Sequence, residues 1–289
     1  MAEWELRPLS LGEILDRTFS LYRKHFVLFL GITAIPHLLP LAINLAKVLL
    51  SGTSTVNLGR AQQLQSGAGN GEIAVFGAFA TLIGAVVTLI AYLFSQGATV
   101  YAVSDLYLGR STTVGESLRK MWGQLANLFG VSILNGFAII VSALALLIPG
   151  IYVACRLITC IPAALLEDLG ARASLERSWE LTKDNAGRSF LIYVLYLAML
   201  YGIIMLFMIP FTVMIAMAPK DPSVFRMSAA LLQVGTFVAQ VLVGPFFLIA
   251  ISVFYYDLRV KKEAFDLQMM MDPQGVTTPA RPSVPSMLS

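Results

Sequence analysis

The sequence predicts an all-α integral membrane bundle of six transmembrane helices, arranged as three units of cytoplasmic interfacial amphipathic helix plus transmembrane hairpin. The chain of 289 residues is 57% hydrophobic and only 13% charged, whereas soluble domains carry about 25% charged residues. Its mean hydropathy is +0.76. Six apolar runs are long enough to cross a bilayer, and basic residues gather between alternate runs. Soluble enzymes, nucleic-acid-binding proteins and disulfide-rich secreted domains are therefore excluded.

The apolar runs give the predicted spans. A transmembrane helix needs about 20 apolar residues to cross roughly 30 Å of hydrocarbon. The second run is longer than one span, so part of it must tilt or project as an amphipathic helix. The fourth is short and contains Arg156 and Pro162, which leaves open whether it crosses fully. The predicted spans cover residues 26–46, 73–103, 125–148, 151–166, 189–218 and 228–256.

Basic residues predict the orientation, because Lys and Arg concentrate in cytoplasmic loops. With a cytoplasmic N-terminus, fifteen of the 20 Lys and Arg residues fall inside and four outside, while Arg156 lies within a span. If residues 151–166 were re-entrant, the basic stretch 172–188 would lie outside. We therefore expect both termini in the cytoplasm. Residues 1–271 form a single polytopic domain in this prediction, and the Pro- and Ser-rich residues 272–289 form a disordered cytoplasmic tail.

A short pattern recurs before the first, third and fifth spans. Each copy has a leucine, a basic residue two positions later and an aromatic residue four positions later. The leucine–aromatic pairs are Leu15–Phe19, Leu118–Trp122 and Leu175–Trp179. Ser/Thr followed three residues later by Glu predicts a capping box in the first two copies. We expect three amphipathic helices on the inner membrane surface, their basic residues facing anionic lipid. Repeats are common in transporters but also build other bundles.

Several motifs resemble those of a bacterial membrane-protein family. They are residues 7–16 (RPLSLGEILD), 21–26 (LYRKHF), 149–152 (PGIY), 167–170 (EDLG), 174–183 (SLERSWELTK) and 255–266 (YYDLRVKKEAFD). Over about residues 7–268 the chain resembles the glycerophosphoryl diester phosphodiesterase membrane domain-like family. This resemblance implies a multi-span inner-membrane protein. In some relatives the domain precedes a soluble phosphodiesterase barrel, but the His-Arg-Gly motif of that barrel is not found here, so the resemblance implies no such activity.

Two polar residues within the spans are candidate intramembrane sites, because ionisable groups are costly there. Arg156 follows the predicted Pro149–Gly150 turn by about 10 Å. It could bond carbonyls near this outer turn, snorkel outward or bind an anion or a lipid headgroup. His37 lies between Pro36 and Pro40, which are expected to kink the helix and free carbonyls for its ring. A proton relay is the alternative, although no acidic residue falls inside the predicted spans.

Charged residues near the inner ends of the fourth and sixth spans form a candidate docking or ion-pair surface. Its members are the charged residues Glu167, Arg177, Asp257, Arg259 and Glu263, together with the aromatic residue Trp179. The four-residue spacing of Asp257–Lys261, Arg259–Glu263 and Lys262–Asp266 predicts helical ion pairs. Either these pairs are solvated on a helix that extends the sixth span, or they tie the third interfacial helix to the tail as a docking surface.

No catalytic, cofactor-binding or metal-binding residue is predicted. The HExxH, CxxC, GxSxG and Walker A motifs are absent. We expect a non-enzymatic inner-membrane protein that acts as a scaffold for a partner or organises lipid. The alternative is a transporter or conduit for a lipidic or anionic solute, with Arg156 in its path. The expected partners are anionic headgroups at the cytoplasmic face and a protein partner or second copy. A net charge of +3 is too small to indicate nucleic acid.

Overall fold

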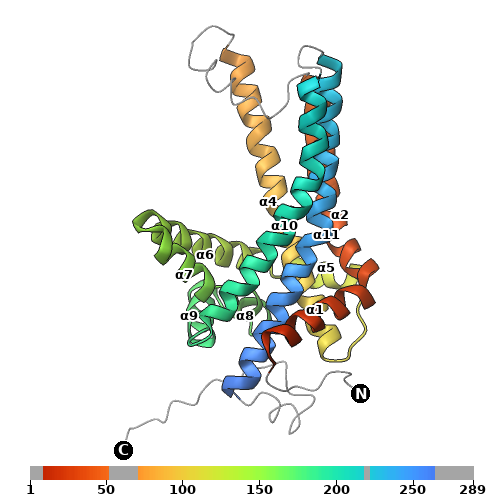
Figure 1. Ribbon diagram of the computed structural model, residues 1–289. Helices are drawn as coiled ribbons and strands as arrows, with labels where there is room; N and C mark the ends of the chain where they lie inside the picture. Colours follow the sequence, from red (N-terminus) through yellow and green to blue (C-terminus); the bar gives the residue numbers. More distant parts are fainter. Residues whose placement is uncertain (1–8, 52–70, 218–221, 264–289) are drawn as a thin grey trace, which may run out of the picture.

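The computed structural model describes residues 9–51, 71–217 and 222–263, and every regular element within these ranges is a helix (Figure 1). The predicted all-helical class is therefore confirmed for the described part. Six segments there are long and apolar enough to cross a membrane, as expected for a multi-pass membrane protein. They are Phe26–Ala46, Thr81–Tyr107, Leu125–Ala145, Leu147–Leu166, Ala186–Val213 and Ala230–Glu263. The predicted tail, residues 272–289, lies outside the described residues.

The helices keep the labels of Figure 1. In chain order they are α1 (Leu11–Lys24), α2 (Phe26–Ser51), α4 (Gly71–Tyr107), α5 (Val114–Trp122), α6 (Leu125–Ala145), α7 (Leu147–Arg156), α8 (Cys160–Leu166), α9 (Ala171–Leu181), α10 (Ala186–Met217) and α11 (Pro222–Glu263). Helix α11 is central, since it packs against α1, α2, α4, α8, α9 and α10. Its C-terminal half supplies fully buried side chains, among them Ile249, Phe254 and Leu258. The core therefore surrounds one end of α11.

Helix α4 explains the length of the second apolar run. Its 37 residues extend about 55 Å, nearly twice the hydrocarbon thickness. Phe79, Leu82 and Ile83 are exposed, whereas residues 95–100 are all buried. The run is one continuous helix that is largely exposed over the described side chains of residues 79–90 and enclosed by protein in its last third. No separate amphipathic helix projects from the described part of this run.

Helices α1 and α5 begin where their capping boxes predict. The Ser10 hydroxyl accepts from the Glu13 amide at 3.3 Å, and the Glu13 carboxylate accepts from the Ser10 amide at 2.7 Å. Thr113 and Glu116 form the same reciprocal pair. Helix α9, the third copy, begins after Gly170 without a side-chain cap. A capping box therefore marks the helix start in the sequence of the first two copies, whereas no side-chain cap marks it in the third.

The fourth apolar run is not one helix. Helix α7 ends at Arg156, and α8 begins only at Cys160. The corner between α6 and α7 lies at the extended residue Leu146, so Pro149 and Gly150 belong to the first turn of α7 and not to the predicted turn. A Cβ on Gly150 would lie 2.6 Å from the Ala143 Cβ, so glycine lets these helices approach closely.

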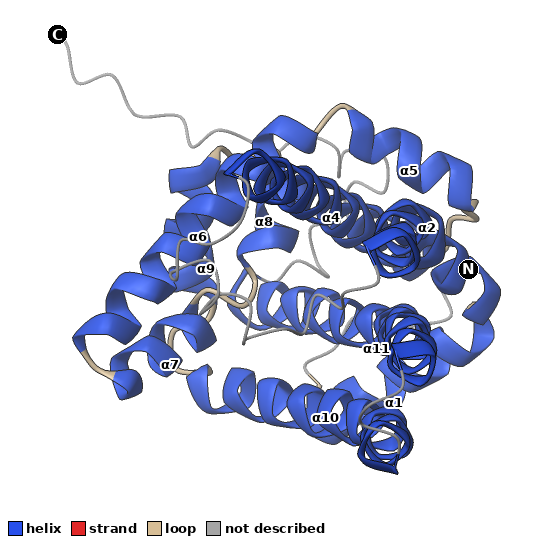
Figure 2. Ribbon diagram, turned by 90° about the horizontal axis from the view of Figure 1, so that it is seen from above, coloured by secondary structure: helices blue, strands red, loops and turns tan. Residues whose placement is uncertain are grey.

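The α6–α7 hairpin diverges from the other long helices. It points to the left of Figure 1, away from the upper parts of α2, α10 and α11. Figure 2 shows α2 nearly end-on and α6 from the side. The hairpin tip exposes large apolar side chains, including Leu144, Leu147 and Ile148. In a membrane protein such a tip faces lipid or another protein.

Candidate functional site

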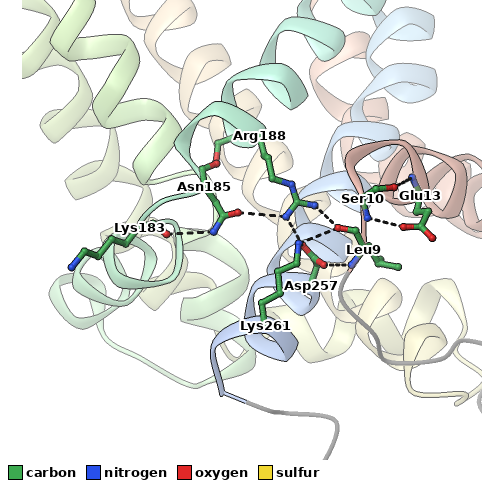
Figure 3. Close-up of polar contacts among 9 residues, drawn as sticks. Leu9, Ser10, Glu13, Lys183, Asn185, Arg188, Asp257 and Lys261 are labelled. Atoms are coloured by element: carbon green, nitrogen blue, oxygen red, sulfur yellow. Dashed lines mark hydrogen bonds and ion pairs between the residues drawn. The ribbon is translucent and has the colours of Figure 1, made fainter.

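A buried carboxylate joins three parts of the chain at the end of the bundle near α1 (Figure 3). Asp257 of α11 has no exposed side-chain surface. Its carboxylate accepts from the Leu9 amide at 2.6 Å, from Arg188 Nη1 at 2.9 Å and from Lys261 Nζ at 3.1 Å. Arg188 and Lys261 also donate to the Leu9 carbonyl, at 2.8 and 3.0 Å. This Asp257 cluster fixes the chain before α1 to α10 and α11.

Sequence reasoning found only part of the Asp257 cluster. It named Asp257 and the Asp257–Lys261 pair, but it did not give Arg188 a role. Arg188 lies in the first turn of α10, and its guanidinium also stands 5.5 Å from the Phe254 ring centre. The signal that could have found it is a single cation at the start of a long apolar run. Leu9 takes part through its backbone, which its side-chain type cannot indicate.

A second cluster surrounds Glu167, at the end of α8. The carboxylate accepts from Arg177 Nε at 2.8 Å and from the Tyr255 hydroxyl at 2.6 Å, and Arg259 Nε lies 3.8 Å away. Arg177 and Arg259 both pair with Glu263 as well. Two arginines and two glutamates therefore alternate and balance their charges. We call this group the Glu167 cluster; its members are Glu167, Arg177, Tyr255, Arg259 and Glu263, and it joins α8, α9 and α11.

The electrostatics of the Glu167 cluster favour the charged form of Arg177. Burial lowers the pKa of Arg177, but the hydrogen bond and charge of Glu167, together with the charge of Glu263, raise that pKa above its ordinary value. Because each charge faces an opposite one, the cluster can hold helices together but offers no unbalanced charge to a substrate. The predicted Arg259–Glu263 helical pair is present, and Lys262–Asp266 falls partly outside the described residues. Tyr255 was missed because an aromatic residue in an apolar run carries no special signal.

Arg156 is buried against α9. Its Nη2 donates to the Trp179 carbonyl at 2.6 Å, and its guanidinium lies 4.5 Å from the Trp179 ring centre. Its own carbonyl accepts from the Ser178 and Thr182 hydroxyls, at 2.9 and 2.8 Å. The described contacts of Arg156 are thus with α9, the third copy of the repeated helix, and not with carbonyls near the Pro149–Gly150 segment. The reason is that α7 ends at Arg156 and the chain turns into α8 beneath α9. The Arg156 Nε has no acceptor among the described residues.

His37 has a backbone partner within its own helix. Helix α2 continues through Pro36 and Pro40. The His37 ring Nδ1 lies 2.8 Å from the Thr33 carbonyl oxygen, and the side chain is buried. Pro36 and Pro40 have no N–H to donate, so they leave the carbonyls of Ile32 and Pro36 without their helical partners. The His37 ring contacts neither of these two carbonyls but that of Thr33.

Helix α4 contributes further polar contacts that the sequence did not indicate. Asp105 pairs with Lys120 of α5 at 2.5 Å. Tyr107 accepts from Arg17 of α1 at 2.9 Å and stacks on Tyr256, with ring centres 4.9 Å apart. Asp105 lies just beyond the predicted end of the second span but inside the observed apolar helix. These contacts attach α1 and α5 to the span helices.

Within residues 9–51, 71–217 and 222–263, no group of three or more His, Cys, Asp or Glu side chains could hold a metal ion. A family model described as the membrane domain of glycerophosphoryl diester phosphodiesterase matches residues 133–281, just over half of the chain. The match runs from within α6 past the end of α11 and includes Arg156 and the Glu167 cluster. No curated protein and no solved structure matches the chain.

Proposed function

Because the chain belongs to the family described as the membrane domain of glycerophosphoryl diester phosphodiesterase, we propose that it is a non-enzymatic inner-membrane scaffold that organises anionic lipid at the cytoplasmic surface. The family description names a membrane domain and not a catalytic one, so membership supports no hydrolytic role. The balanced charges of the Glu167 cluster also favour a structural role over chemistry.

The proposed orientation places α1, α5 and α9 at the cytoplasmic surface, each followed by a pair of spans, with both chain termini inside. The distribution of Lys and Arg along the chain supports it. A reporter that is active only in the periplasm should therefore stay silent when fused after Lys183. A strong signal from that fusion would contradict the orientation.

One observation carries the lipid-organising role. The aromatic residues at equivalent positions of the three repeats, Phe19, Trp122 and Trp179, are 60%, 71% and 41% exposed. Aromatic side chains anchor proteins at the headgroup level, and exposed basic residues lie on the same helices, such as Arg23 and Arg119. Three anchors of one type, each beside positive charge, favour contact with anionic lipid.

The scaffold role follows from how these helices are held. Helix α1 is fixed beside the Asp257 cluster, α5 by the Lys120–Asp105 pair, and α9 by the Glu167 cluster. Each of these attachments includes a carboxylate that is nearly or fully buried, with its side chain no more than 10% exposed. The helices therefore keep a constant spacing on the span bundle, so lipids bound to them would be held in a constant arrangement.

The proposal is tested by lipid enrichment around the whole protein. The protein carries a donor dye in vesicles of phosphatidylcholine and phosphatidylglycerol, and energy transfer to acceptor-labelled lipid reports which headgroup gathers. We expect enrichment of phosphatidylglycerol, reduced at least twofold in Phe19→Ala/Trp179→Ala. The matched control is Phe137→Ala/Ile140→Ala, which removes two exposed apolar side chains of α6. Equal transfer from wild type and the Phe19/Trp179 variant would contradict the lipid-organising role.

A scaffold also binds protein, and we assign this contact to the exposed face of α9 beside the Glu167 cluster. Arg172 lies on this face, with its side chain 90% exposed. A photo-crosslinking residue at position 172 should give a discrete protein adduct in cells, whereas one at Ile140 should not. No adduct from position 172 would contradict binding at this face.

The second candidate function, a conduit for a lipidic or anionic solute, is favoured by Arg156. This buried cation has no ion-pair partner among the described residues, and its Nε lacks an acceptor. Solute flux into reconstituted vesicles compares wild type with Arg156→Ala and Arg156→Lys. Flux that is abolished in Arg156→Ala and retained in Arg156→Lys, with unfolding unchanged, would favour the conduit over the scaffold.

A further inference from the structure

A lateral groove of about 520 Å³ lies between α2, α4 and α5. Its walls are apolar and aromatic, and Arg119 is the charged residue among its lining side chains. The lining residues are Ile35, Pro36 and Leu39 of α2, Val87, Ile90, Ala91 and Phe94 of α4, and Leu118, Arg119 and Trp122 of α5. Ile35, Leu39 and Ile90 are also partly open to the surroundings, so the groove opens on the side of the bundle.

Helix α5 is held closely against both walls of the groove. A Cβ on Gly97 of α4 would lie 1.9 Å from the Met121 sulfur, and one on Gly31 of α2 would lie 2.9 Å from a Val114 methyl group. Met121 is fully buried. The two glycines therefore admit α5 side chains that a larger residue would displace. This packing fixes the position of Arg119 and Trp122 relative to the groove.

Arg119 is a cation without a carboxylate partner in the described part of the chain. Its neighbour Lys120 pairs with Asp105, whereas Arg119 is exposed and joins no ion pair there. Trp122 packs on Phe94, with ring centres 5.5 Å apart, and is 71% exposed. An apolar groove with an aromatic ring and an unpaired cation at one end matches the chemistry of a phospholipid, which has apolar chains and an anionic phosphate.

The position along α4 agrees with this chemistry. The groove ends at Phe94, and residues 95–100 are buried in protein. The groove therefore ends where α4 passes from its exposed part into the protein core, and Arg119 and Trp122 line it together with Phe94.

We propose that this groove binds an acyl chain of an anionic phospholipid whose phosphate pairs with Arg119. The inference rests on the proposed lipid-organising function and assigns it a site and a lipid class. Lipid chains are as apolar as the groove walls, so the chain contact supplies fit rather than selectivity. Selectivity comes from the headgroup, because one basic residue near an anionic surface contributes about 1 kcal/mol, or roughly fivefold in affinity.

Native mass spectrometry of the whole protein tests the site, with dioleoyl phosphatidylglycerol and dioleoyl phosphatidylcholine as probes. We expect about fivefold tighter binding of phosphatidylglycerol, with this preference lost in Arg119→Gln. Arg110→Gln is the matched control, since it removes an exposed cation of the loop after α4, outside the groove. Val87→Phe should weaken both lipids by filling the groove. Its control, Val86→Phe, adds the same bulk to an exposed neighbour outside it.

Three outcomes would overturn the assignment. The first is an undiminished preference in Arg119→Gln; since that side chain is exposed, the variant retains the packing of α5. The second is displacement of bound lipid by soluble glycerol 3-phosphate, which would indicate a phosphate site without a chain. The third is a dimer abolished by Val87→Phe, which would make the groove an interface between copies. If wild type still enriches phosphatidylglycerol in vesicles, these outcomes reject the groove and leave the proposed function standing.

Discussion

The Asp257 cluster allows a quantitative test of what holds α10, α11 and the chain before α1 together. Asp257→Asn keeps the shape of the side chain and an acceptor for the Leu9 amide, but it removes the charge facing Arg188 and Lys261. Breaking a buried ion pair from one side costs about 3–5 kcal/mol. Arg188 and Lys261 are 21% and 26% exposed, so water recovers part of this cost. We expect Asp257→Asn to lower the free energy of unfolding by about 2–3 kcal/mol.

The measurement is equilibrium unfolding of the purified protein in mixed detergent and sodium dodecyl sulfate micelles. A double-mutant cycle with Arg188→Gln should give a coupling energy of about 1–3 kcal/mol. The matched control is Glu176→Gln, whose partner Arg172 is fully on the surface; it should cost less than about 1 kcal/mol. If Asp257→Asn costs no more than Glu176→Gln, or if the two cluster variants simply add, the carboxylate does not hold these helices together.

Other predictions use the same unfolding measurement. Gly97→Leu should destabilise the protein by about 1–3 kcal/mol, because its Cβ would meet the Met121 sulfur. Combining it with Met121→Ala should recover part of this loss. No recovery would show that the two residues do not compete for space. Arg156→Met should cost about 2 kcal/mol through loss of the Trp179 carbonyl bond and ring contact; an unchanged midpoint would argue against that contact. Glu167→Gln should lower the free energy of unfolding by about 2–4 kcal/mol, because it leaves Arg177 and Arg259 with less opposing charge. A loss no larger than that of the surface control Glu176→Gln would contradict the charge balance proposed for the Glu167 cluster.

The fold was predictable where a local pattern decides it. An apolar run of sufficient length crosses a bilayer whatever its neighbours are, and the six expected runs all correspond to apolar helical segments. The starts of α1 and α5 were predictable too, because a capping box is formed within four residues of sequence. The break at Arg156 was only partly predictable: Pro162 is tolerated in the first turn of a new helix, but no local pattern places the end of α7 at Arg156 and the start of α8 at Cys160.

The candidate site required information that no local pattern contains. Glu167 and Glu263 were recognisable as charged residues near span ends, but only the packing of α8, α9 and α11 brings both against Arg177. Arg156 has a polar partner because α9 folds back over the end of α7, not because of any residue near it in sequence. The length and charge of a segment decide whether it enters a membrane, since the bilayer acts on each segment separately. Which buried charges then neutralise each other depends on contacts between segments far apart in the chain, and those exist only once the helices have packed.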